Sequence, residues 1–137
     1  MSNDNRSQVR RWFDEVWCQK RTEAIDELMA PDALGHGLGE GGAPTQGTEE
    51  FKAFHQKFCR AFPDLQIQVD EVLAERDLTA VRFTATGHHT GEGLDLPPTG
   101  RPVSFTGMVF SRWHEGQLVE GWNLIDFPAM QQQLLPP

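Results

Sequence analysis

The chain has 137 residues and a formal net charge of −8, from 20 acidic against 12 basic side chains. The length fits one domain over residues 1–137 with a core large enough for a pocket, and the acidic balance excludes the electrostatic footprint typical of nucleic-acid binding. Because no apolar run is long enough to cross a membrane and the N-terminus MSNDNRSQVRR lacks a secretion signal's apolar core, we expect no membrane partner and a cytoplasmic location.

Two helices are predicted near the N-terminus. Between Ser7 and Lys20, the apolar residues recur with the i, i+3, i+4, i+7, i+8 spacing of an amphipathic helix. The stretch TEAIDELM fits a second, short helix with Thr22 as its N-cap and Pro31 just beyond its end. The glycine-rich segment that follows predicts only a brief strand around residues 33–38, and then a loop.

A third helix is predicted from Thr48, with phenylalanines spaced along one face and Pro63 as its stop. The apolar period then changes from helical to alternating, which indicates strands. The expected strands cover residues 65–72, 78–89, 103–113 and 117–126, and a short helix is expected from Pro128. Strands joined by turns pair antiparallel, so the class is α+β, with helices packed on one face of a bent sheet.

Four short motifs in register resemble the SnoaL-like polyketide cyclases of the nuclear-transport-factor-like superfamily. They are AFPDL at 61–65, HTGE at 89–92, PPTGR at 97–101 and EGW at 120–122. The resemblance implies an α+β cone, a cone-shaped barrel in which a curved antiparallel or mixed sheet wraps around helices. It also implies a homodimer and no metal or organic cofactor. Relatives close the last ring of aromatic polyketides by intramolecular aldol condensation, with one aspartate as acid and base.

That aspartate is similar in position to Asp126, at the end of the last predicted strand. Alternation puts Asp126 on the same strand face as Trp122, so we expect both inside the cone. An apolar wall would raise the pKa of the carboxyl group toward the range useful for proton transfer. The structural alternative is that Asp126 caps the helix that begins near Pro128.

Histidines are the candidate partners of this carboxylate. His36 lies in the small early strand near the expected pocket mouth, while His88 and His89 are adjacent and therefore point to opposite faces of their strand. We take His36 and His88 as candidate proton donors. His55 and His114 fit a helix surface and a turn, and neither is included.

Metal ligation is not expected, because no H-x-x-x-H or H-x-H spacing places two ligands on one face. Arg82 lies in an otherwise apolar strand, where its guanidinium needs a partner: Asp126, Glu120 or an anionic substrate. Both Cys18 and Cys59 are expected simply to pack.

The pocket is expected to be apolar and to hold a small hydrophobic or aromatic ligand. The predicted substrate-binding residues are Trp12, Phe13, Phe54, Phe58, Arg82, Met108 and Trp122. The sheet face that the helices leave bare is expected to form the homodimer.

Three functions remain open. The first is a cofactor-independent cyclase, lyase or isomerase in which Asp126 removes a proton next to a carbonyl group. The second is an enzyme like a steroid isomerase or an epoxide hydrolase, although the absence of tyrosine excludes a phenolic hydrogen-bond donor. The third is a non-catalytic ligand-binding or dimerisation module.

Overall fold

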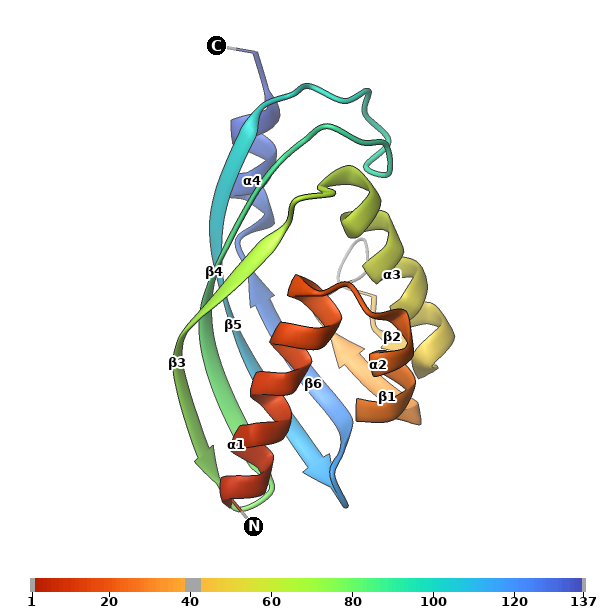
Figure 1. Ribbon diagram of the computed structural model, residues 1–137, viewed down its shortest axis with the longest axis vertical. Coiled ribbons are helices and arrows are strands. Elements are labelled where there is room, and N and C mark those ends of the chain that lie inside the picture. The colour runs from red at the N-terminus through yellow and green to blue at the C-terminus, as the bar shows by residue number, and fades with distance from the viewer. Residues whose placement is uncertain (1, 39–42, 137) are drawn as a thin grey trace.

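A six-stranded sheet with helices against one face forms the body of the protein. The computed structural model describes residues 2–38 and 43–136 (Figure 1). The strand order is β2-β1-β6-β5-β4-β3, and the sheet is curved and open rather than a closed barrel. In Figure 1 the strands β3, β4 and β5 lie on the left, with α1, α2 and α3 to their right. The expected α+β class is confirmed, and the expected barrel closure is not found.

The N-terminal half supplies most of the helices. Its elements are α1 (Ser2–Arg11), the π-helical segment η1 (Trp12–Cys18), α2 (Thr22–Leu28), β1 (Met29–His36), β2 (Thr45–Gln46) and α3 (Gly47–Ala61). The expected N-cap at Thr22 is wrong, because Arg21 occupies that position, and α3 begins at Gly47 with Gln46 as its N-cap rather than at Thr48. At α3 the Gln46 backbone N–H donates to the Glu50 carboxylate at 2.9 Å, which satisfies one of the free donors at this helix end.

The C-terminal half is the predicted meander. Its elements are β3 (Gln66–Glu75), β4 (Leu78–His88), β5 (Pro102–His114), β6 (Gln117–Ile125) and α4 (Phe127–Leu134). Each strand pairs antiparallel with the next. The sheet becomes mixed because β1, which is longer than the sequence indicated, pairs parallel with β6.

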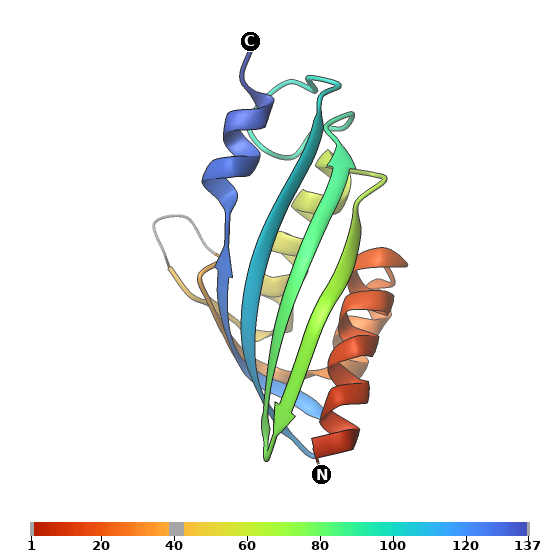
Figure 2. The ribbon, with the colours of Figure 1, turned by 90° about the vertical axis from the view of Figure 1, so that its left-hand side faces the viewer.

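The two faces of the sheet differ in what covers them. Phe83 and Phe105 belong to the buried core under the helices. The opposite face of β3, β4 and β5 is turned to the viewer in Figure 2, with α3 behind it. On this outer face Met108 is 58% exposed and Leu124 is 77% exposed, so large apolar side chains lie uncovered there.

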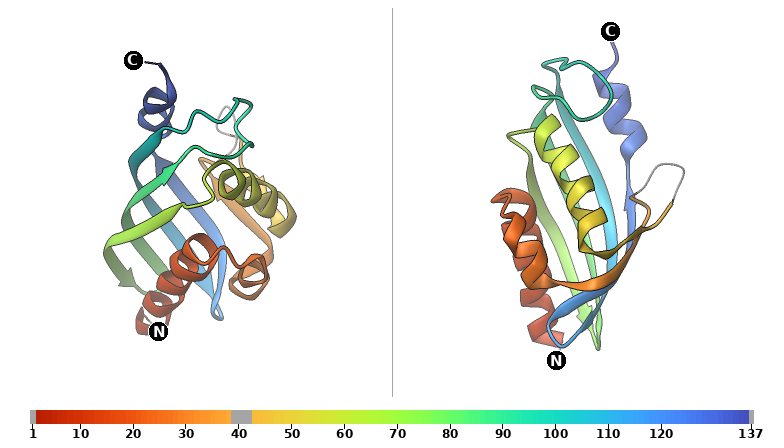
Figure 3. Two further views of the ribbon diagram at one scale, coloured as in Figure 1. Left: turned by 45° about the horizontal axis from the view of Figure 1, so that its top comes forward. Right: turned by 90° about the vertical axis from the view of Figure 1, so that its right-hand side faces the viewer.

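A long connection between β4 and β5, residues 89–101, folds over one end of the sheet next to α3 (Figure 3). The Gly91 backbone N–H donates to the Ala61 carbonyl at 3.1 Å, and a Cβ at Gly91 would lie 1.9 Å from the Arg60 carbonyl oxygen. Only glycine permits this approach, which explains one residue of the HTGE motif. The base of the connection is closed by hydrogen bonds from His89 N to Arg101 O and from Gly100 N to His89 O, at 2.9 and 2.7 Å.

Beyond the end of β6, helix α4 lies beside the edge of β5. The Gln133 side chain accepts from the Ser104 backbone N–H at 2.7 Å and donates to the Ser104 carbonyl at 2.9 Å. No helix within the described residues combines the length and the apolar character that crossing a membrane requires.

Candidate functional site

An apolar cavity lies between the helices and the inner face of the sheet. Its volume is about 70 Å³. Its lining residues include Trp12, Phe13 and Trp17 from η1, Phe51, Phe54 and Phe58 from α3, Ala33 and Gly35 from β1, and Gly121, Asn123 and Ile125 from β6. We call it the inner cavity.

The inner cavity exists because large and small residues face each other. The helices contribute aromatic rings, and two of these rings, Trp12 and Phe51, have centroids 5.1 Å apart. On the sheet side the lining positions include Ala85 and Gly121, which occupy little volume. At Gly121 an added Cβ would meet no atom closer than 3.8 Å, so it would make ordinary van der Waals contacts without a clash.

Two polar side chains, Ser111 and Asn123, line the inner cavity. Both lie close to the point that a Cβ added at Gly121 would occupy: Ser111 Oγ is 4.0 Å and Asn123 Nδ2 is 3.8 Å from it. The Asn123 amide donates to the His36 carbonyl at 2.9 Å, which fixes the orientation of its side chain. Among the described residues, none that lines this cavity carries a carboxylate, an imidazole or an amine. Its chemistry is therefore that of neutral hydrogen bonding in an apolar space.

A second, open hollow of about 1190 Å³ lies between α3, the 89–101 connection and α4. We call it the outer groove. It shares Phe54, Phe58 and Phe127 with the inner cavity. Ring centroids are 4.8 Å apart for Phe54 and Phe58, and 5.6 Å apart for Phe58 and Phe127. These three rings therefore form the partition between the two hollows.

Four of the predicted substrate-binding residues line the inner cavity: Trp12, Phe13, Phe54 and Phe58. The expectation that Met108 and Trp122 point inward is wrong, because both lie on the outer face of the sheet. Arg82 also lies on the outer face and pairs with Glu71 at 3.3 Å, not with Asp126 or Glu120. The physical reason is strand alternation: Phe105, Gly107, Val109 and Ser111 of β5 and Gly121, Asn123 and Ile125 of β6 face inward, so Met108 and Trp122 between them face outward.

Asp126 is not inside the cone. Its carboxylate is exposed and accepts a hydrogen bond from the Ala129 backbone N–H at 3.1 Å, which makes it the N-cap of α4. The structural alternative for this residue is confirmed, and the expectation that it shares an interior face with Trp122 is wrong. Neither hollow has Asp126 in its lining.

The two candidate histidines lie on the outer face, each beside a carboxylate. His36 Nε2 is 2.7 Å from Glu120, and its ring stacks on Trp122 with centroids 5.6 Å apart. The strand containing His36 does reach the inner cavity, but through its neighbour Gly35. His88 hydrogen-bonds Asp64 through Nδ1 at 2.7 Å and through its backbone N–H at 2.8 Å. These bonds lower the pKa of the Asp64 carboxyl.

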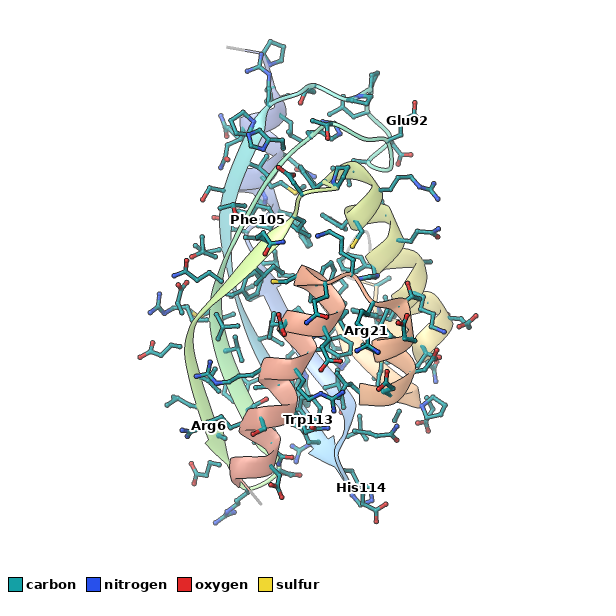
Figure 4. All side chains as sticks on the ribbon, in the orientation of Figure 1. Arg6, Arg21, Glu92, Phe105, Trp113 and His114 are labelled. Atoms are coloured by element: carbon teal, nitrogen blue, oxygen red, sulfur yellow. The ribbon has the colours of Figure 1, made fainter. Side chains whose placement is uncertain are left out.

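Two other histidines, His55 and His89, are buried, so the expectation that His55 lies on a helix surface is wrong. His55 is 3% exposed and donates through Nε2 to the Val16 carbonyl at 2.6 Å. Its spacing from Phe51 and Phe58, at i+4 and i−3, is the signal that could have placed it on the buried helix face. His89 is 0% exposed, and its Nδ1 accepts from the Thr99 backbone N–H at 3.2 Å. Burial lowers the pKa of both imidazoles. His114, by contrast, lies at the tip of the β5–β6 turn, as expected (Figure 4).

Both cysteines are half-buried, as expected for packing. Cys18 Sγ donates to the Ile67 carbonyl at 3.3 Å, and burial raises the pKa of the Cys59 thiol. Within residues 2–38 and 43–136, no three His, Cys, Asp or Glu side chains are grouped in a way that could hold a metal ion.

The family model for the SnoaL-like polyketide cyclases matches residues 7–134. The chain belongs to the SnoaL-like polyketide cyclase family. A comparison of this SnoaL-like protein with curated proteins finds none that matches.

Solved structures similar to this SnoaL-like protein include family members and a protein assigned another activity. A protein from Jannaschia sp. CCS1 assigned as a SnoaL-like polyketide cyclase is 27% identical, with a TM-score of 0.89 over 99% of this chain and 95% of that chain. IdmH from Streptomyces antibioticus, assigned as a polyketide cyclase, is 32% identical, with a TM-score of 0.81 over 93% and 96%. AclR from Streptomyces galilaeus, assigned as a hydroxylase, is 26% identical, with a TM-score of 0.85 over 100% and 85%.

Proposed function

We propose that this SnoaL-like protein binds a small, flat, apolar molecule whose carbonyl oxygen meets Ser111 and Asn123 in the inner cavity. The observation that carries the proposal is an enclosed apolar hollow in which two neutral polar side chains converge. Such a site holds a ligand by burying its apolar surface and orients it through a few hydrogen bonds. Neutral donors in a water-poor space also stabilise negative charge that develops on a carbonyl oxygen.

The ligand extends beyond the inner cavity. The volume of about 70 Å³ is smaller than the roughly 150 Å³ apolar cavity that accommodates benzene in an engineered protein. One end of a fused-ring molecule therefore enters the inner cavity only when the partition rings turn aside, while its remainder lies in the outer groove.

Filling the inner cavity tests this proposal. Gly121→Ala adds a Cβ whose nearest neighbours lie at 3.8 Å, so the fold should tolerate it, and Gly121→Val adds two further methyl groups on the cavity side of the strand. Binding of a neutral probe, 2-naphthamide, is followed through the fluorescence of Trp12 and Trp17, which line the cavity. We expect affinity to fall stepwise, by about tenfold or more in the valine variant.

Leu124→Val is the matched control, because Leu124 lies on the same strand but faces outward. It should bind 2-naphthamide as the parent does. Unchanged affinity in Gly121→Val, with the fold intact, would rule out the inner cavity as the binding site.

A second candidate is cyclase-type acid and base catalysis by Asp126. It is supported by membership of a polyketide cyclase family, and by the position of Asp126 next to Phe127, which borders both hollows. In this candidate the carboxylate leaves the Ala129 N–H and turns toward the groove to take a proton next to the ligand's carbonyl group.

Substitution of Asp126 separates capping from catalysis. Asparagine and aspartate cap helices about equally well, so Asp126→Asn should keep the parent's free energy of unfolding, whereas Asp126→Ala should lose about 1 kcal/mol. Both variants should bind 2-naphthamide as the parent does, because Asp126 lines neither hollow. On a ligand that the parent cyclises, acid and base catalysis predicts that Asp126→Asn lowers turnover by about 10²–10⁴-fold. Full turnover in that variant would remove Asp126 from the reaction.

We also propose that a second copy of the chain covers the outer face of the sheet. The exposed large residues Met108, Phe110, Trp122 and Leu124 come from the adjacent strands β5 and β6. Contiguous exposed apolar surface of this kind usually marks a contact. Charged side chains beside the patch form ion pairs, Arg82 with Glu71 and Arg112 with Asp77. Each copy therefore presents both positive and negative groups to the other copy.

A further inference from the structure

We propose that the outer groove selects ligands that carry a carboxylate, and that Arg101 binds this carboxylate. The inference rests on the proposed function, because it assigns the outer part of the same ligand. It adds the chemical class of the ligand and a residue that determines specificity.

Arg101 is half-buried in the lining of the outer groove. Its guanidinium makes no side-chain hydrogen bond or ion pair with the residues that the structure describes. Other arginines differ from it: Arg21, also half-buried, pairs with Glu23 and Glu27, and Arg60 is exposed. A guanidinium that is partly removed from water without a protein partner is suited to an anion supplied by a ligand.

The backbone around Arg101 is held in place. Its carbonyl accepts from His89 N at 2.9 Å, and its N–H donates to Thr99 Oγ1 at 3.2 Å. Thr99 is in turn bound through its backbone N–H to the buried His89 ring. The prolines of PPTGR restrict the residues just before this point. This rigidity lowers the entropic cost of placing the guanidinium against a ligand.

The surroundings of Arg101 favour an amphipathic anion. Leu94, Phe58, Met130 and Leu134 supply apolar surface to the same groove. Among the described residues, Lys57 and Asp95, which carry opposite charges, also line the groove. Glu92 lies on the same connection, near α3 (Figure 4).

One half-buried guanidinium, that of Arg101, suits a single carboxylate. A multiply charged anion such as a phosphate ester is disfavoured, because the chain carries a net charge of −8. We therefore assign the ligand as a flat apolar acid whose rings reach the partition of Phe54, Phe58 and Phe127.

A matched pair of probes tests the assignment. At pH 7, calorimetry measures binding of 2-naphthoate and of 2-naphthamide, which share the ring system and differ in charge. We expect 2-naphthamide to place its amide at Ser111 and Asn123, and 2-naphthoate to turn its carboxylate to Arg101. A charge-assisted, bidentate contact predicts that the parent binds 2-naphthoate about tenfold or more tightly than 2-naphthamide. In Arg101→Gln this preference should disappear while the affinity for 2-naphthamide is unchanged.

Arg60→Gln is the control, because it removes the same charge from an exposed position of α3. It should keep the preference for 2-naphthoate. Equal affinities for the two probes in the parent, or a preference that persists in Arg101→Gln, would overturn the assignment. The affinity for 2-naphthamide is not expected to depend on Arg101. If 2-naphthamide failed to bind the parent, this result would count against the proposed function, and the carboxylate inference would fall with it.

Discussion

The free energy of unfolding is expected to fall as the pH drops from 7 to 5, because His55 and His89 are buried in their neutral form. Burial lowers the pKa of both groups, and for His55 nearby Lys20 lowers it further. In the unfolded chain each has the ordinary pKa of about 6.5. Below that value the unfolded chain binds protons that the folded chain does not, so stability is lost toward acid. Each histidine contributes at most about 1.4 kcal/mol per pH unit.

Urea unfolding between pH 7 and pH 5 measures this effect. His55→Phe keeps an aromatic ring beside Trp17 and Phe51 but cannot be protonated, so its stability should depend less steeply on pH. His114→Gln, at a side chain that is 75% exposed, should follow the parent. Asp64 also has a lowered pKa, but its contribution is lost only below about pH 4, outside the range measured. A parent profile that is flat between pH 7 and pH 5 would contradict the assignment.

Phe110→Glu is expected to convert a dimeric protein into a monomer. Phe110 is 54% exposed and lies opposite Trp122 in the β5–β6 pairing, at the centre of the outer patch. A carboxylate buried there without a partner would weaken association by about 100-fold or more. Light scattering at micromolar concentration should report twice the chain mass of 15.4 kDa for the parent and 15.4 kDa for the variant.

Leu135→Glu provides the control for this experiment. Leu135 is also an exposed apolar residue, but it follows α4 and borders the outer groove. It should leave the dimer intact. A parent that scatters as a 15.4 kDa monomer would refute the proposed dimer.

Local patterns predicted most of the elements. Alternating residues gave the four meander strands, and helical spacing gave α3 and the buried face of η1. The parallel pairing of β1 with β6 could not be predicted, because it joins segments more than 80 residues apart, such as Gly35 and Gly121, through backbone hydrogen bonds. Nothing in a short glycine-rich stretch specifies such a partner.

The faces of β6 were assigned wrongly for a physical reason. Both faces carry apolar residues, and bulk made the face of Trp122 and Leu124 look interior. The interior side is the one with Gly121, Asn123 and Ile125, because the register with β5 places these residues on the face covered by the helices. In β6 the bulky side chains therefore mark the proposed contact surface, and the glycine marks the cavity.

The hydrogen bonds between Gln133 and Ser104 have a consequence for self-association. Beyond Thr106, whose carbonyl accepts from Asp126 N, β5 has no strand beside it on the β6 side. A free backbone edge of this kind can template the addition of a strand from another molecule, the first step toward fibrous aggregates. The Gln133 amide occupies both the donor and the acceptor of Ser104, as a neighbouring strand would. The Gln133 side chain of α4 thus blocks the addition of a strand at this short stretch of β5.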